Sequence, residues 1–248
     1  MSKMVALNQQ AHSNIHVLAD KVEEQAADLH MVPVVTSEWL KLVAQFPILF
    51  TKHVQTGHFI CVALMGFEPG ENLFWQQAKF HSVYLPLNIA RLPFFVGQDE
   101  HSGDNYVLCI DEQSEVISGH HGQSLFTADG QASDYLRDTQ AKMAQLVEGE
   151  RDTKALLDML LTHKLLVPLA LDITFENGQS KILKGLYGID EEKLNGLPAD
   201  VLLALQASGY LQLIYTQIAS LAQIYVLIDK QNKRQQQSSP WFGATQSN

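Results

Sequence analysis

The chain has 248 residues, with 17 lysines and arginines against 27 aspartates and glutamates, which gives a formal net charge of −10. This acidic balance argues against general binding to nucleic acid or to anionic membranes, because phosphates repel a negative protein. Apolar types make up 46% of the chain and charged types 18%, a composition typical of globular proteins. Two cysteines are too few for a disulfide scaffold or a four-cysteine zinc site.

The first half of the chain predicts a polar N-terminal segment followed by short strands. Residues 8–30 are rich in Gln, Ala, His and acids, which predicts a mobile or peripheral segment rather than a packed element. Residues 32–35 and 48–50 predict extended pieces. Residues 58–65 are apolar on both faces, which is typical of a central strand, and residues 106–110 form a second clear strand.

Helices dominate the second half. The sequence predicts two helices near 132–148 and 152–166, with Gly149 as the break between them. A β-hairpin follows, because Asn177-Gly178 supplies two residues that tolerate positive φ between two apolar runs. Asp190 is then placed to cap a short helix.

The stretch 201–228 carries no charge and is long enough to imitate a membrane span. Its polar residues, however, argue for a soluble amphipathic helix. The predicted buried stripe consists of Leu211, Ile214, Tyr215, Ile218, Leu221, Ala222, Tyr225 and Ile228. The predicted solvent face carries Gln212, Thr216, Ser220 and Gln223.

Strands come early, helices come later, and no βαβ rhythm repeats. This order predicts an α+β fold with a largely antiparallel mixed sheet, helices after residue 130 and a C-terminal amphipathic helix. We expect a peripheral lead-in over 1–30, a single domain over 31–230 and a disordered, Gln/Ser-rich tail over 231–248. The start of the chain lacks the apolar stretch of a secretory signal, which predicts a cytoplasmic location and leaves leaderless export open.

The sequence contains no motif that predicts catalysis. The phosphate-binding patterns G-x-G-x-x-G and G-x-x-x-x-G-K-[ST] are absent, and so is the nucleophile elbow G-x-S-x-G. Ten histidines occur without an H-E-x-x-H pair or a Cys/His quartet. Cys61 and Cys109 lie in apolar strands, where a thiol stays protonated and inert. We therefore assign no catalytic residue, metal ligand or cofactor.

The least ordinary stretch is the aromatic, proline-containing segment from residue 67 to residue 95. It predicts either a concave ligand site with apolar walls or a loop-rich wall of the core. For the first alternative, the candidate ligand-binding residues are Glu71, Asn72, Trp75, Tyr84 and Arg91, together with Asp111 at a strand end.

Several blocks in a fixed order resemble the SapC family, which is named after a bacterial surface-array (S-layer) locus protein. The blocks are Val32-Pro33, Pro47-Ile48-Leu49-Phe50, Val62-Ala63-Leu64-Met65-Gly66, Gly70-Glu71-Asn72-Leu73-Phe74, Tyr84-Leu85-Pro86, Leu92-Pro93-Phe94, Cys109-Ile110-Asp111-Glu112, Gly122-Gln123-Ser124-Leu125-Phe126, Asp129-Gly130, Gly185-Leu186-Tyr187, Leu194, Gly209 and Ser220-Leu221. The resemblance covers roughly residues 30–228. One block departs from the family pattern, because Trp75-Gln76-Gln77 stands where relatives have an acid and a glycine before a tryptophan.

The resemblance implies no catalytic residues, but its name connects the family with surface-layer or envelope processes. Together with the residues, it favours a soluble, non-catalytic accessory protein that binds a small-molecule or protein partner. We expect no nucleic-acid partner and no membrane span. The alternative is a small-molecule enzyme of unknown class with an aromatic-lined cleft, in which Glu71, Arg91 and Asp111 would converge in one pocket. A homo-oligomer is left open.

Overall fold

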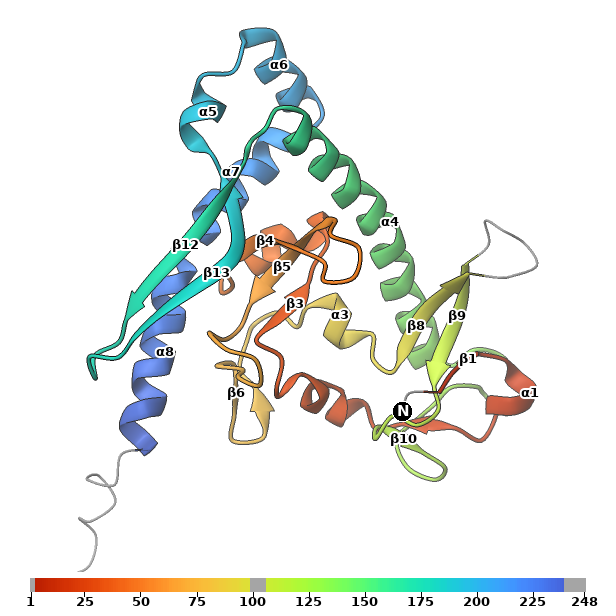
Figure 1. The fold of residues 1–248 in the computed structure, drawn as a ribbon. Helices are drawn as coiled ribbons and strands as arrows, with labels where there is room; N and C mark the ends of the chain where they lie inside the picture. Colours follow the sequence, from red (N-terminus) through yellow and green to blue (C-terminus); the bar gives the residue numbers. More distant parts are fainter. Residues whose placement is uncertain (1–2, 99–105, 239–248) are drawn as a thin grey trace, which may run out of the picture.

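The α+β class is confirmed by the computed structural model, which describes residues 3–98 and 106–238 (Figure 1). The strands form four sheets rather than one, and every strand pairing within these residues is antiparallel. The largest sheet has five strands in the order β12 (Leu166–Thr174), β13 (Ser180–Ile189), β4 (Ile48–Lys52), β5 (Phe59–Leu64) and β3 (Met31–Pro33).

The centre of this sheet follows from its apolar strands. In β4 the side chains of Ile48, Leu49 and Phe50 are fully buried, and β5 lies between β4 and β3 as its two-sided apolar pattern predicted. The predicted hairpin is also present as β12 and β13, with Gly178 at φ 82° in the turn. Glycine suits this position, because a residue without a Cβ adopts a positive φ at little cost.

The N-terminal segment differs from the prediction of a peripheral lead-in. Its β1 (Met4–Ala6) pairs with β9 (Tyr106–Asp111), which in turn pairs with β8 (Phe94–Gln98). Val17 and Ala26 are both fully buried, Val17 in the smaller hydrophobic core and Ala26 in the larger one. The sequence hid this packing because the elements are two to four residues long or 3₁₀-helical, too short to show a hydrophobic period.

Two small sheets and the helices complete the chain. The small sheets have the order β10 (Ile117–Ser118), β2 (His16–Val17) and β11 (Gln123–Ser124), and the pair β6 (Trp75–Gln76) with β7 (Lys79–Phe80). The helices are α1 (Gln9–His12), η1 (Ala19–Ala26), η2 (Thr36–Glu38), α2 (Trp39–Leu42), α3 (Leu87–Ala90), α4 (Asp134–Thr162), α5 (Glu191–Asn195), α6 (Ala199–Ala207), α7 (Tyr210–Ser220) and α8 (Gln223–Ser238). As predicted, the Asp190 side chain caps α5 by accepting a hydrogen bond from the Lys193 backbone N–H at 2.9 Å.

The prediction of two helices broken at Gly149 is wrong. Instead, α4 is one continuous helix of 29 residues. Gly149 is buried inside it, and a Cβ at this position would lie 2.7 Å from Cγ2 of Val35 and 3.2 Å from Oγ of Ser37. The glycine therefore allows the segment at Val35 to approach the helix closely and does not end the helix.

This helix connects two hydrophobic cores. Leu136, Met143 and Leu146 in its first half belong to the smaller core, around β8 and β9. Leu156 and Leu160 in its second half belong to the larger core, around the five-stranded sheet. In Figure 1, α4 accordingly extends from β8 and β9 to the region of α6, and the β12–β13 hairpin lies on the other side of the molecule.

The C-terminal helices bury the predicted stripe in part, since Ile214 is fully buried and Leu211, Ile218, Leu221 and Ile228 pack against the larger core. Thr216 and Ser220 are buried although they were expected in solvent, whereas the side chains of Tyr215 and Tyr225 are 50% and 76% exposed. The cause lies in β4, because β13 pairs only with Phe50 and Thr51 of that strand. The Ser220 hydroxyl therefore accepts a hydrogen bond from the Ile48 N–H at 2.9 Å, and the Gln217 amide donates to the Ile48 carbonyl at 2.8 Å.

Within the described residues, one helical segment, Tyr210–Gln237, has the length and the apolar composition that could cross a membrane. Only 22% of its most apolar window is buried, so the face that contacts the sheet is narrow. The tail predicted to be disordered begins at residue 231, but its residues 231–238 are helical and belong to α8. The helix continues because its polar residues, such as Gln, Lys and Arg, are good helix formers. The rest of that tail lies outside the described residues.

Candidate functional site

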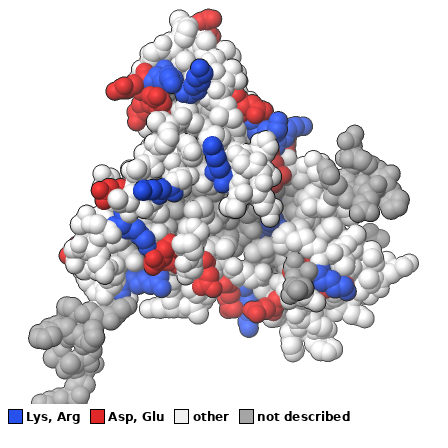
Figure 2. Space-filling model, in the orientation of Figure 1, with Lys and Arg blue, Asp and Glu red and all other residues white. Residues whose placement is uncertain are grey.

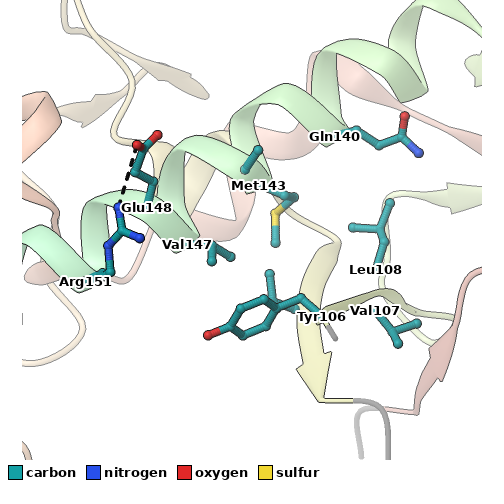
Figure 3. Close-up of a pocket in the computed structure, with 10 residues that line it drawn as sticks. Tyr106, Val107, Leu108, Gln140, Met143, Val147, Glu148 and Arg151 are labelled. Atoms are coloured by element: carbon teal, nitrogen blue, oxygen red, sulfur yellow. Dashed lines mark ion pairs between the residues drawn. The ribbon is translucent and has the colours of Figure 1, made fainter. Parts of the chain in front are cut away.

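A groove runs along α4, where three hollows open between this helix and two sheets, the five-stranded sheet and the sheet β1-β9-β8. The first hollow has a volume of about 560 Å³ and lies between α4 and the β8–β9 ladder (Figure 3). Its walls are mainly apolar and include Val96, Leu108, Met143, Ala144 and Val147. Tyr106 directs its ring toward Met143 and Val147 (Figure 3).

The other two hollows continue the groove. The middle hollow, about 230 Å³, shares Val96, Tyr106, Met143 and Val147 with the first hollow. The third hollow, about 390 Å³, shares Asn88 and Glu150 with the middle one and reaches Pro33, Phe59, Ile60 and Leu161. Together they form what we call the α4 groove, which follows the helix from Gln140 to Leu161 over about 30 Å at 1.5 Å per residue.

Arg91 lies in the middle of this groove and is held in one orientation. Its Nε donates to Oδ1 of Asn88 at 2.8 Å, one of its terminal nitrogens donates to the Phe94 carbonyl at 2.5 Å, and its guanidinium stacks 4.4 Å from the Phe95 ring centroid. Burial lowers the pKa of Arg91, and the negative charge of Glu150 opposes that shift. A fixed, partly desolvated guanidinium beside a carboxylate is suited to binding polar groups of a ligand.

The same residues join the two sheets. The Asn88 amide donates to the Pro33 carbonyl at the end of β3, at 3.0 Å, and its oxygen accepts from Arg91. Arg91 in turn donates to the carbonyl of Phe94 in β8. These consecutive hydrogen bonds fix the distance between β3 and β8, each of which is the last strand of its sheet.

Further charges along the groove come in opposite pairs on α4. Arg151 lies 3.9 Å from Glu148, an ion pair that is marked in Figure 3, and Lys154 lies 3.1 Å from Asp158. These pairs are solvent-exposed and contribute little to stability. The groove thus combines apolar walls with a rim of balanced charge.

Of the six residues predicted to bind a ligand, only Arg91 lines the α4 groove. Glu71 and Asn72 are buried and bind the chain's own backbone. One oxygen of Glu71 accepts from the Phe67 N–H at 2.8 Å, and the other lies 3.9 Å from Arg234. The Asn72 amide donates to the Ala26 carbonyl at 2.7 Å.

The role of Asn72 is testable by substitution. Asn72→Ala leaves the buried Phe74 N–H without its partner and removes one of two donors to the Ala26 carbonyl, which keeps the Leu29 N–H. We expect a loss of about 1–3 kcal/mol in the free energy of unfolding, because an unpaired buried N–H pays its full desolvation cost. The check is urea denaturation, with Gln76→Ala as the control, since Gln76 is exposed and its loss should cost under about 0.5 kcal/mol.

The remaining candidates lie elsewhere. Trp75 pairs with Phe80 in the β6–β7 hairpin, whose turn residues Gln77 and Ala78 both have positive φ. Asp111 accepts from the backbone N–H of Lys3 at 2.8 Å and so attaches the N-terminal segment to β9. Glu71, Arg91 and Asp111 therefore do not share a pocket among the described residues, and the convergence that the enzymatic hypothesis required is not found.

Tyr84 points to a residue that the sequence did not single out. Its hydroxyl donates to Oε2 of Glu38 at 3.0 Å, and the same oxygen accepts from the Leu87 N–H at 2.6 Å. Burial raises the pKa of Tyr84, and the charge of Glu38 raises it further. Glu38 is fully buried, but in the sequence it stands as a single acid after Thr36 and Ser37, where a helix start accounts for it.

The aromatic segment forms part of the core. Phe67, Phe74, Phe80 and Phe94 are all at most 5% exposed, and Phe74 contacts both Phe46 and Phe80. This favours the second of the two predicted alternatives, a loop-rich core wall. The available signal for the groove was the spacing of Gln140, Met143, Ala144 and Val147 inside the first predicted helix. Its continuation to Leu161 was hidden because a break was expected at Gly149.

No group of three or more His, Cys, Asp or Glu residues is placed to hold a metal ion within residues 3–98 and 106–238. Cys61 is buried, and burial raises the pKa of its thiol. His12 is also buried, and its Nε2 lies 3.3 Å from Glu112, which belongs to the attachment of the N-terminal segment.

Comparison with known families agrees with the resemblance in the sequence. The SapC family model matches residues 7–227, nearly the whole chain. The chain belongs to the SapC family. No curated protein and no solved structure matches this SapC-family chain. The matched region includes most of the N-terminal segment, in line with its packing against β9 and into both cores. Family membership names no ligand, so the function rests on the α4 groove.

Proposed function

We propose that this SapC-family protein is a non-catalytic accessory protein that binds an elongated, largely apolar partner or ligand in the α4 groove. The observation that carries the proposal is the continuity of three hollows along α4, with apolar walls and one fixed guanidinium. Concave, mainly apolar surfaces with a few oriented polar groups are typical of binding sites.

The charges support a partner other than nucleic acid. On the face that Figure 2 shows, lysines and arginines are interspersed with acids rather than gathered in one basic patch. The net charge of −10 acts in the same direction. The surface-array origin of the family name supports an envelope-linked process, with the protein itself in the cytoplasm. Cell fractionation tests that location, and recovery in the membrane fraction would instead implicate the apolar Tyr210–Gln237 helix.

The test of binding compares two alanines on α4. Ala144 lines the first hollow, whereas Ala141 is also exposed and lines none of the three hollows. We expect Ala144→Arg to abolish binding of co-purifying ligand or partner, seen as lost adduct mass or lost complex in native mass spectrometry. Ala141→Arg should retain it. Equal behaviour of the two variants, with thermal stability unchanged in both, would contradict binding in the groove.

A further inference from the structure

The free edge of β8 borders the first and middle hollows. β8 is the last strand of the sheet β1-β9-β8, so within residues 3–98 and 106–238 one side of its main chain has no neighbouring strand. Such an edge presents unpaired N–H and C=O groups that can accept another strand. Val96 of β8 lines both hollows, opposite Met143 and Val147 of α4.

The register shows which main-chain groups point away from β9. The Leu7 N–H donates to the Leu108 carbonyl, so Leu108 directs its main-chain groups toward β1. The Asp111 N–H donates to the Pro93 carbonyl, so the alternating residues of β9 face β8. Because directions alternate in an antiparallel ladder, Val96, which is opposite Leu108, directs its N–H and C=O off the free edge.

The neighbouring outward position is already filled by Arg91. The Phe94 N–H donates to the Arg91 carbonyl at 2.8 Å, and the Phe94 carbonyl accepts from the Arg91 guanidinium. Among the described residues, no hydrogen bond outside the sheet involves the main chain of Val96. Arg91 therefore ends the open part of the edge at Phe94 and leaves Val96 available beside the hollows.

We propose that this edge binds an extended segment of a partner polypeptide as an added β-strand. The inference rests on the proposed function, because it names the occupant of the same groove. The segment's main chain bonds to the Val96 N–H and C=O, and its alternate side chains enter the apolar first hollow. Arg91 and Glu150 then meet the carbonyl and N–H groups of its next residues in the middle hollow.

A peptide fits the order of polar and apolar parts better than an amphiphile with one head group. The charged pair Arg91 and Glu150 lies in the middle hollow, between two hollows of about 560 and 390 Å³. A fatty acid would place its carboxylate at Arg91 and fill one flanking hollow only. An extended peptide at ~3.4 Å per residue would follow the whole groove with about nine residues, with polar main chain throughout.

The test uses the full chain and a phage-displayed library of random dodecapeptides as the probe. In the free protein, we expect the Val96 amide to exchange with solvent rapidly and the Phe95 and Gly97 amides, which face β9, to be protected. A selected peptide should protect the Val96 amide in hydrogen-exchange NMR. Val96→Pro, which removes an outward N–H without breaking a hydrogen bond to β9 and is tolerated on an edge strand, should weaken binding about tenfold. Val96→Ala, which keeps the N–H, should bind within about threefold of the wild type.

The outcomes separate this inference from the proposed function. Selected peptides that bind Val96→Pro as well as Val96→Ala, or that leave the Val96 amide unprotected, would overturn strand addition. If Ala144→Arg still abolished their binding, the groove would remain the binding site. Failure to select any peptide would also overturn the inference, while loss of the native partner in Ala144→Arg would uphold the proposed function.

Discussion

Gly149→Ala should destabilise the protein by about 1–2 kcal/mol, although alanine is the better helix former by about 1 kcal/mol. The added Cβ would lie 2.7 and 2.8 Å from Cγ2 and Cβ of Val35. Valine is stiff at χ1, so its side chain cannot turn away, and the segment must move from the helix. The measurement is urea denaturation at neutral pH, followed by far-ultraviolet circular dichroism.

Two further variants isolate the close approach as the cause. Ala141→Gly on the exposed face of the same helix should cost about 1 kcal/mol, which gives the propensity term alone. Val35→Ala removes Cγ2, the nearer of the two contacted atoms, and keeps Cβ, so the double variant with Gly149→Ala should lose less stability than the sum of the single changes. A Gly149→Ala variant more stable than the wild type would contradict the packing of Val35 against α4.

Sequence patterns predicted the fold where local chemistry alone decides the structure. Asn177-Gly178 determines the β12–β13 turn, Asp190 caps α5, and the two-sided apolar run of β5 makes it an interior strand. The prediction at Gly149 failed because a glycine can be required by a tertiary neighbour, here Val35, as well as by a helix end. Nothing near Gly149 in the sequence identifies that neighbour.

The candidate site was predictable only in part. Arg91 was found because it stands out among aromatic residues and prolines, whereas Glu71, Asn72 and Asp111 serve the protein's own backbone. A polar residue that satisfies a buried backbone group has the same local signature as one that binds a ligand. The burial of polar residues on α7 was missed for the same reason, because Ser220 and Gln217 complete the hydrogen bonds of Ile48 in a strand far away in sequence.

The second large effect should come from Glu38, whose carboxylate is fully buried and connects η2 to the segment before α3. Its oxygens accept from the Val35 N–H at 3.2 Å, the Leu87 N–H at 2.6 Å and the Tyr84 hydroxyl at 3.0 Å. Glu38→Ala leaves all three donors without this partner. We expect a loss of about 3 kcal/mol or more in the free energy of unfolding, measured by urea denaturation.

The pH dependence of this residue has a definite sign. Burial raises the pKa of Glu38 above its ordinary value of 4.5, and the three hydrogen bonds and the charge of Lys41 oppose that shift only in part. The folded protein therefore binds this proton more tightly than the unfolded chain. Consequently, Glu38 contributes stability that is fully present below pH 4.5 and is lost as the pH rises through the folded-state pKa.

Glu38→Gln tests this sign, because glutamine cannot ionise but can still accept from the Leu87 N–H and the Tyr84 hydroxyl. The wild type minus Glu38→Gln difference in unfolding free energy should decrease between pH 4 and neutral pH. Tyr84→Phe, which keeps Glu38 and removes one donor, should lower stability by about 1–2 kcal/mol. It should also shift the fall toward higher pH, because the Tyr84 hydrogen bond favours the carboxylate and opposes the effect of burial on the Glu38 pKa. A difference that grows with pH would contradict the raised pKa.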